Sequence, residues 1–335
     1  MKLGQVAART DPGRKRRGNE DAYVCRPPLF AIADGMGGAQ AGEVASALAA
    51  EALTESHVDG GGERRIAELI QEANRRVHDR ASTDAATSGM GTTITVALVE
   101  DDGRIAFGHV GDSRAYRLRG DELEQVTNDH SLVAELVRRG ELSQAEAEVH
   151  PQRSVITRAL GTDPDIDVDT FSIQAEAGDV YLLCSDGLSD MVDHATLESI
   201  IGTSRGDLDS AARALVQAAN RAGGEDNITT VLFEIVEGDA VEPDERTREQ
   251  VAIPPPDELD GEDTLHPEDA VMPPPAAPRD DTMIVPASAI DAAAPAAAAG
   301  EEEFEAGLGR RLLALLVIAA LCVLIVVLVW WGLAR

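Results

Sequence analysis

Short runs of alternating or continuous apolar residues recur through the first 237 residues of the chain. They predict eight strands, at residues 4–8, 29–33, 92–99, 104–110, 113–118, 167–173, 179–184 and 229–236. Apolar residues recur at helical spacing in five further stretches, at 41–55, 63–80, 131–138, 194–201 and 207–222. Several strands follow one another after only a few residues, which favours antiparallel hairpins over a parallel sheet with crossover helices. The pattern therefore predicts one α+β domain over residues 1–237.

Residues 238–309 have a different composition. They contain 19 acidic residues, three arginines and 11 of the 16 prolines, and an alanine tract runs through 292–299. Such a segment cannot bury enough apolar surface to offset the conformational entropy that ordering it would cost. We therefore expect an acidic, Pro/Ala-rich disordered linker.

The composition of the C-terminal region, residues 310–335, is typical of a membrane anchor. Its central part, 312–334, has 23 residues without a charge and is flanked by arginines on both sides. As a helix it would span about 35 Å, enough for a hydrocarbon core of about 30 Å. Two arginines precede it and one follows, so the N-terminal side is expected in the cytoplasm. We predict a single transmembrane helix in the inner or plasma membrane, with the first domain cytoplasmic.

Charge and residue usage exclude several functions. Asp and Glu total 60 against 29 Lys and Arg, a formal net charge of −31, which is unsuited to binding a nucleic-acid backbone. Lys2 and Lys15 are the only lysines, and neither stands where a P-loop or a protein kinase requires one. The cysteines Cys25, Cys184 and Cys322 form no CxxC pair, which argues against a zinc site or a disulfide framework.

Acidic motifs lie at the ends of the predicted strands. Any one Asp-Gly after a strand is usually just a turn. Five such motifs in one domain favour another interpretation, because carboxylates brought together repel one another unless a cation lies between them. Oxygen ligands without His or Cys suit Mg²⁺ or Mn²⁺ rather than zinc. The motifs are Asn19-Glu20-Asp21, Asp34-Gly35, Gly111-Asp112, Ser185-Asp186-Gly187 and Glu225-Asp226-Asn227.

The order of these motifs resembles a known family. With an arginine three residues before the first motif and Ser88-Gly89-Met90-Gly91-Thr92-Thr93 between the second and third, the chain is similar to the metal-dependent serine/threonine protein phosphatases of the 2C (PPM) type, in their bacterial form. The resemblance covers residues 5–236. It implies a four-layer α-β-β-α sandwich, two antiparallel sheets flanked by helices, followed here by the disordered linker and the transmembrane helix.

The resemblance also assigns a centre of two Mn²⁺ or Mg²⁺ ions. Asp34 matches the carboxylate that bridges the two ions, while Asp186 and Asp226 match ligands of the first. The Gly35 carbonyl belongs to the second ion, where Glu20 contributes through water. The cations lower the pKa of a water that attacks phosphorus, so no protein nucleophile is needed.

Further positions surround this centre. Arg16 matches the arginine that holds the phosphate and counts with Asp34, Asp186 and Asp226 as catalytic. Asp21 is expected to orient water, and Asp112 resembles a ligand of a third, weaker ion. Met36 stands where animal members carry a general-acid histidine. His130 and His150 could replace it, although a structural role is the simpler interpretation.

The sequence therefore predicts a phosphoserine/phosphothreonine phosphatase whose partners are phosphorylated proteins, in particular membrane Ser/Thr kinases and their substrates. A phosphatase acting on an anti-sigma-antagonist in a partner switch, or an inactive phosphoprotein-binding scaffold, are the alternatives. Within the linker, Thr264 and Thr282 each follow two acidic residues and are candidate phosphorylation sites, the alternative being a plain acidic linker.

Overall fold

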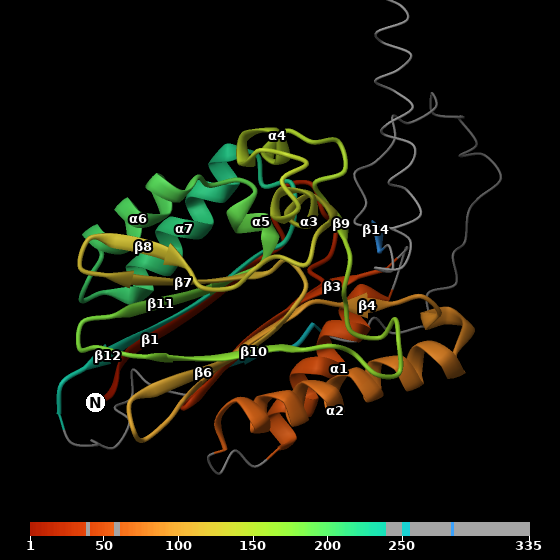
Figure 1. Ribbon diagram of the computed structural model, residues 1–335, viewed down its shortest axis with the longest axis horizontal. Coiled ribbons are helices and arrows are strands. Elements are labelled where there is room, and N and C mark those ends of the chain that lie inside the picture. The colour runs from red at the N-terminus through yellow and green to blue at the C-terminus, as the bar shows by residue number, and fades with distance from the viewer. Residues whose placement is uncertain (38–40, 57–60, 239–249, 255–282, 285–335) are drawn as a thin grey trace, which may run out of the picture. The chain divides into compact units, whose positions relative to one another are not determined.

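The computed structural model describes residues 1–37, 41–56, 61–238, 250–254 and 283–284 (Figure 1). By its contacts the chain divides into two units, Met1–Ile284 and Val285–Arg335. The second unit, and with it the predicted transmembrane span 312–334, lies outside the described residues. So do both candidate phosphorylation sites, Thr264 and Thr282. Among the helices that are described, none is long and apolar enough to cross a membrane.

Two antiparallel sheets form the centre of the first unit. The first sheet has the order β1-β12-β11-β7-β8. Its strands are β1 (Lys2–Asp11), β12 (Ile228–Val236), β11 (Val180–Cys184), β7 (Arg114–Arg119) and β8 (Glu122–Gln125). The second sheet has the order β10-β6-β5-β3-β2-β13, with β4 paired to β3. Its strands are β10 (Asp169–Gln174), β6 (Arg104–Val110), β5 (Ile94–Val99), β3 (Leu29–Met36), β2 (Asp21–Arg26), β13 (Gln250–Ala252) and β4 (Gly91–Thr92).

Aromatic side chains fill the space between the sheets. Phe30 of β3 stacks on Phe233 of β12 with ring centroids 4.3 Å apart, which joins the second sheet to the first. Tyr181 of β11 also stacks on Phe233, with ring centroids 5.1 Å apart. All three side chains are fully buried, so this contact contributes both apolar burial and a fixed alignment of the two sheets.

Helices cover the outer face of each sheet (Figure 1). On the second sheet, α1 (Gly42–Glu55) and α2 (Gly62–Thr83) bury residues such as Leu53 and Ile70 in a common core. On the first sheet, α6 (His194–Thr203) and α7 (Leu208–Ala222) do the same with Leu197 and Leu215. The predicted layering of helices, sheet, sheet and helices is therefore confirmed for the described residues.

Short elements complete the unit. They are the 3₁₀ turn η1 (Ala85–Thr87), α3 (Leu132–Arg138), α4 (Gln144–Glu148), α5 (Asp186–Ser189), and the two-residue strands β9 (Val155–Ile156) and β14 (Met283–Ile284), which pair in parallel. All five predicted helices are found to within three residues at either end. The helices α4 and α5 are too short to show helical periodicity and were not predicted.

The structure departs from the predicted hairpins at one important place. Residues 104–110 and 113–118 were expected to be neighbouring strands, but β6 lies in the second sheet and β7 in the first. The turn between them, with Gly111 at φ +115°, therefore crosses from one sheet to the other. Strands β2, β8 and β9 were also missed.

The expectation of a linker without secondary structure is wrong at two short places. Gln250–Ala252 forms β13, which pairs antiparallel with β2, and Met283–Ile284 forms β14. Both pairings use backbone hydrogen bonds, which depend little on side-chain composition. The rest of 238–309, apart from Gly238 and residues 253–254, lies outside the described residues.

The contact between β6 and α2 leads to a stability prediction. A Cβ on Gly108 would lie 2.1 Å from Ile66 Cγ2 and 2.6 Å from Ile70 Cδ1. Gly108→Ala should therefore overpack this layer and lower the free energy of unfolding by about 1–3 kcal/mol. The matched control is Gly202→Ala in α6, where a Cβ meets nothing within 4 Å, so the change should be neutral or stabilising by up to about 1 kcal/mol. Urea denaturation measures both, and equal effects would contradict the packing argument.

Candidate metal centre

The candidate carboxylates come together because several strands end at the same place. Asp34 in β3 is directly opposite Asp21, the first residue of β2. On the other sheet, Asp186 begins the helix that follows β11, and Asp226 lies two residues before β12. Since β11 and β12 are antiparallel neighbours, the end of one adjoins the start of the next. Both sheets therefore contribute carboxylates to one region.

Asp21 connects the two sheets directly. Its Oδ2 accepts hydrogen bonds from Thr229 Oγ1 at 2.6 Å and from Ser185 Oγ at 2.9 Å. Its Oδ1 is buried and has no hydrogen-bond partner. Burial raises the pKa of this carboxyl to about 6, although the two hydroxyls act in the opposite direction. The Oδ2 of Asp21 thus joins the two sheets, and its Oδ1 remains free to bind a ligand.

Asp34 and Asp186 carry the strongest electrostatic penalty. Burial and the surrounding negative charges raise the pKa of both carboxyls well above the usual range. For Asp34 the nearby charges are those of Asp21, Asp186, Asp226 and Asp112, in that order. Asp34, the residue predicted to bridge the two ions, is therefore the one whose pKa is raised by the charges of all the other candidate aspartates.

Two glycines let Glu20 approach this group. A Cβ on Gly35 would lie 2.1 Å from the Gly42 carbonyl oxygen, and a Cβ on Gly42 would lie 2.2 Å from Glu20 Oε2. The Gly35 amide donates to the Glu20 carbonyl at 3.2 Å. Burial and the charge of Glu43 raise the pKa of Glu20 to about 7. A side chain at either glycine would collide with Glu20 or with the Gly42 backbone, so the close approach of Glu20 depends on glycine at both positions.

Arg16 lies against the same group. Its Nη2 is 2.7 Å from Asp226 Oδ2. Burial lowers the pKa of the guanidinium, but the hydrogen bond and charge of Asp226, with the charges of Glu20 and Asp34, together outweigh burial, so the pKa is raised. The loop that carries Arg16 is held by Asn227, which the sequence analysis did not single out as a site residue. The Asn227 side chain accepts from the Glu20 amide at 2.8 Å and donates to the carbonyls of Pro12 and Gly18.

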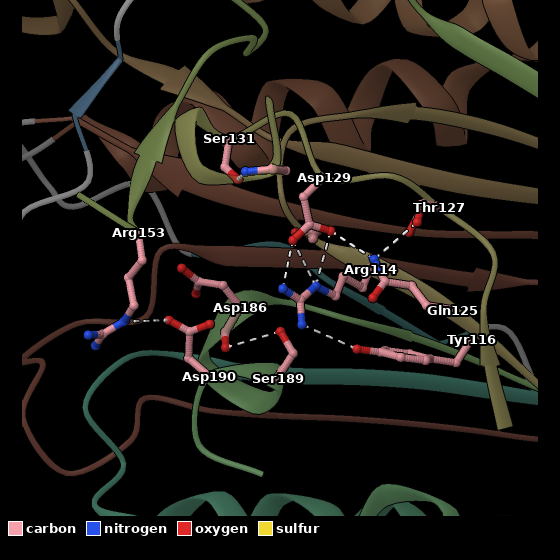
Figure 2. A network of polar contacts seen from close by, with 12 residues as sticks. Arg114, Tyr116, Gln125, Thr127, Asp129, Ser131, Arg153, Asp186, Ser189 and Asp190 are labelled. Atoms are coloured by element: carbon pink, nitrogen blue, oxygen red, sulfur yellow. Dashed lines mark hydrogen bonds and ion pairs between the residues drawn. The ribbon is translucent and has the colours of Figure 1, made fainter. Parts of the chain in front are cut away.

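Asp112 lies in the turn between β6 and β7, where the chain crosses from one sheet to the other. The charges that act on it most strongly are those of Asp129 and Asp190, which belong to a polar network that the sequence analysis missed (Figure 2). Arg114 donates from Nε and Nη2 to Asp129, the shortest distance being 2.6 Å, and from Nη1 to Tyr116 at 3.4 Å. Asp190, one turn after Asp186, lies 3.8 Å from Arg153 Nε. Burial and the charges of Asp129 and Asp190 raise the pKa of Asp112 to about 7.

The donor set fits a hard divalent cation. Buried oxygens of Asp21, Asp112 and Asp186 have no hydrogen-bond partner, and the whole group is carboxylate. Among the described residues, however, no three His, Cys, Asp or Glu side chains already converge on a point where a metal ion could be held. Two physical reasons explain why these carboxylates do not converge. Arg16 engages Asp226, and unscreened carboxylates repel one another. The ligand types and their burial fit a divalent cation, and binding one would draw the carboxylates together.

His130 and His150, the two histidines considered as proton donors, make structural contacts. His130 is 1% exposed, its Nδ1 accepts from the Gly111 amide and its Nε2 lies 3.1 Å from Asp169 Oδ2. His150 accepts from the Gln152 amide at 3.2 Å. These contacts favour the structural interpretation of both residues over the interpretation as proton donors.

Comparisons with known proteins agree with this geometry. The family model for protein phosphatase 2C matches residues 18–232. The serine/threonine phosphatase stp of Listeria innocua is 40% identical over 238 residues, which are 68% of this chain and 94% of that protein.

Solved structures are similar as well. The serine/threonine phosphatase PstP/Ppp of Mycobacterium tuberculosis is 38% identical with a TM-score of 0.67, over 70% of this chain and 100% of that one. The catalytic domain of serine/threonine protein phosphatase PstP in complex with two manganese ions is 36% identical with a TM-score of 0.64, over 70% and 99%.

The chain belongs to the protein phosphatase 2C family. Its activity is accordingly that of a protein serine/threonine phosphatase, as the sequence predicted.

The raised pKa values predict how stability depends on pH without metal. Glu20, Asp21 and Asp112 bind protons more tightly in the folded state than in the unfolded state. Their contribution to stability is therefore full below about pH 4 and is lost as pH rises through 6 to 7. In chelator, the melting temperature should fall between pH 5 and pH 8 by on the order of 5 °C. Glu20→Gln should flatten this fall, as measured by calorimetry, and a melting temperature that rises over this range would contradict the electrostatic argument.

Proposed function

We propose that the chain hydrolyses phosphoserine and phosphothreonine at a centre of two Mn²⁺ or Mg²⁺ ions, and that its main targets are membrane Ser/Thr kinases and their substrates. The observation that carries the metal assignment is the buried group of carboxylates from both sheets, several of whose oxygens have no partner. The solved relative with two manganese ions supports the number of ions.

Asp34, Asp186 and Asp226 would hold the ions, with the Gly35 carbonyl and, through water, Glu20. When bound, the two ions supply an activated water and offset the negative charge of the phosphate. Asp34 is central to this assignment because the charges of the other aspartates converge on it. Asp21 has one oxygen fixed by Ser185 and Thr229, and its free Oδ1 is suited to accepting a hydrogen bond from water.

Arg16 would exchange partners during the reaction. It is paired with Asp226 in the structure, and its guanidinium fork matches the oxygens of a phosphate group. With Asp226 holding a cation, Arg16 would leave this ion pair and bind the phosphate instead. We assign Arg16 the role of holding the phosphate and stabilising charge on its equatorial oxygens.

Removing one carboxylate charge tests the metal assignment. Asp34→Asn, Asp186→Asn and Asp226→Asn should each reduce turnover of a phosphothreonine peptide by at least about 100-fold, because each loses a charged ligand. In chelator, Asp34→Asn should melt at the same or a higher temperature than the native chain, since it loses a repelling charge. Activity should vanish in chelator and return with Mn²⁺. Native turnover in the Asp34 variant would reject the assignment.

The membrane assignment rests on the sequence of residues 310–335, with the catalytic domain on the cytoplasmic side. Anchoring confines the enzyme to the layer in which membrane kinases act and raises its effective concentration toward them without a new contact. Phosphorylated residues on such kinases are therefore the substrates we favour, ahead of freely diffusing phosphoproteins.

Truncation separates anchoring from chemistry. A chain ending at Ile284 keeps β13, β14 and the whole first unit but loses the predicted anchor. We expect the full chain in a salt-washed membrane fraction and the truncated chain in the supernatant. Peptide turnover should be equal, whereas dephosphorylation of a kinase embedded in vesicles should be slower for the truncated chain. Equal rates on the embedded kinase would contradict the proposed role of the anchor.

A further inference from the structure

Asp112 lies on a part of the backbone that neither sheet secures. Strand β6 ends at Val110 and β7 begins at Arg114, so the residues between them have no place in either ladder. Asp112 is nevertheless 8% exposed, and its buried Oδ1 has no partner. A carboxylate on a crossover turn needs another element to fix its position if it is to hold a cation.

That element is His130, which binds both polar backbone groups of Gly111. Its Nδ1 accepts from the Gly111 amide at 3.1 Å, and its own amide donates to the Gly111 carbonyl at 2.7 Å. Gly111 packs closely against Thr93, since a Cβ at this position would lie 2.5 Å from Thr93 Cβ. The residue before Asp112 is thus held between Thr93 on one side and His130 on the other.

His130 is itself fixed from residues 155–169. Its carbonyl accepts from the Thr157 amide at 2.8 Å, and its Nε2 faces Asp169 Oδ2 at 3.1 Å, although this contact is not well enough aligned to satisfy Nε2. Asp169 in turn accepts from Arg158 Nη1 at 2.6 Å. Because Nδ1 accepts the Gly111 amide, the ring proton of the neutral histidine lies on Nε2, toward Asp169.

We propose that His130 is a positioning residue for Asp112, and that it sets the affinity of the cation that Asp112 holds without contacting that cation. The inference rests on the proposed function and on the expectation, implied by the family resemblance, that Asp112 binds a third, weaker ion beside the two core ions. The hydrogen bonds of His130 go to Gly111 and Thr157, and its ion-pair contact goes to Asp169 rather than to Asp34, Asp186 or Asp226, so we expect its effect on the weak site and not on the two core ions.

The test compares two amide side chains of different length, asparagine and glutamine, in place of His130 in the full chain. His130→Asn keeps an acceptor close to the place of Nδ1, whereas His130→Gln moves the polar group toward the place of Nε2. Metal is removed, Mn²⁺ is titrated back, and free Mn²⁺ is followed by electron paramagnetic resonance and by calorimetry. His130→Gln should weaken the weakest site by about 10–100-fold, the usual effect of losing an outer hydrogen-bond partner. His130→Asn should lie closer to the native chain, and the two tight sites should be unchanged in both.

A matched control separates positioning from general loss of stability. Asn74 is also fully buried, and its side chain accepts from the Gly161 amide at 2.9 Å, but none of its hydrogen bonds reaches residues 111–113. Asn74→Leu should lower the melting temperature without changing the weak Mn²⁺ site. If His130→Gln likewise lowers the melting temperature and leaves the weak site within twofold of the native chain, the inference is wrong.

A double variant distinguishes this inference from the proposed function. Asp112→Asn should abolish the weak site by itself, and adding His130→Gln should then cause no further loss of Mn²⁺ binding. A weak site that survives Asp112→Asn would overturn the assignment of Asp112, and the inference with it. A weak site that depends on Asp112 but not on His130 would overturn the inference alone.

Discussion

Negative charge kept away from water is the constraint on which the active-site region depends. Burial raises the pKa of Asp34 and Asp186 well above the usual range, and each further carboxylate adds to the effect. A fold built only for stability would not gather these groups. The arrangement becomes favourable when a divalent cation is present, so the residues that destabilise the metal-free chain are those that give it a function.

The rest of the architecture serves to hold these charges in place. The stacked pair Phe30 and Phe233 fixes the alignment of the two sheets in the interior. Near the site, Asp21 joins the sheets again through Ser185 and Thr229. The two sheets are therefore held in alignment by an apolar contact in the interior and by polar contacts next to the site. This is why a ligand group divided between two sheets can be maintained against its own repulsion.

Much of this could be predicted from the sequence, and the reasons for the failures are physical. Asp34 and Asp186 follow apolar runs and precede glycine, which is a local signal. The pairing of Arg114 with Asp129, or of His130 with Gly111, depends on folding of the crossover and leaves no local pattern. Periodicity likewise identified residues 113–118 as a strand but could not say which sheet they join. The assigned roles of Glu20, Asp112 and Arg16 came from family resemblance rather than from the pattern itself.

The pairing of β13 with β2 has a consequence for solubility. β2 would otherwise be an outer strand of its sheet, with backbone amides and carbonyls free to pair with the same strand of a second molecule. Gln250–Ala252 occupies that edge between Tyr23 and Cys25, so a segment with the composition of a linker also shields the molecule from self-association. A catalytic domain cut at residue 237 would expose this edge next to Asp21 and Glu20. The segment that covers this edge therefore lies beyond the domain boundary that composition alone suggests.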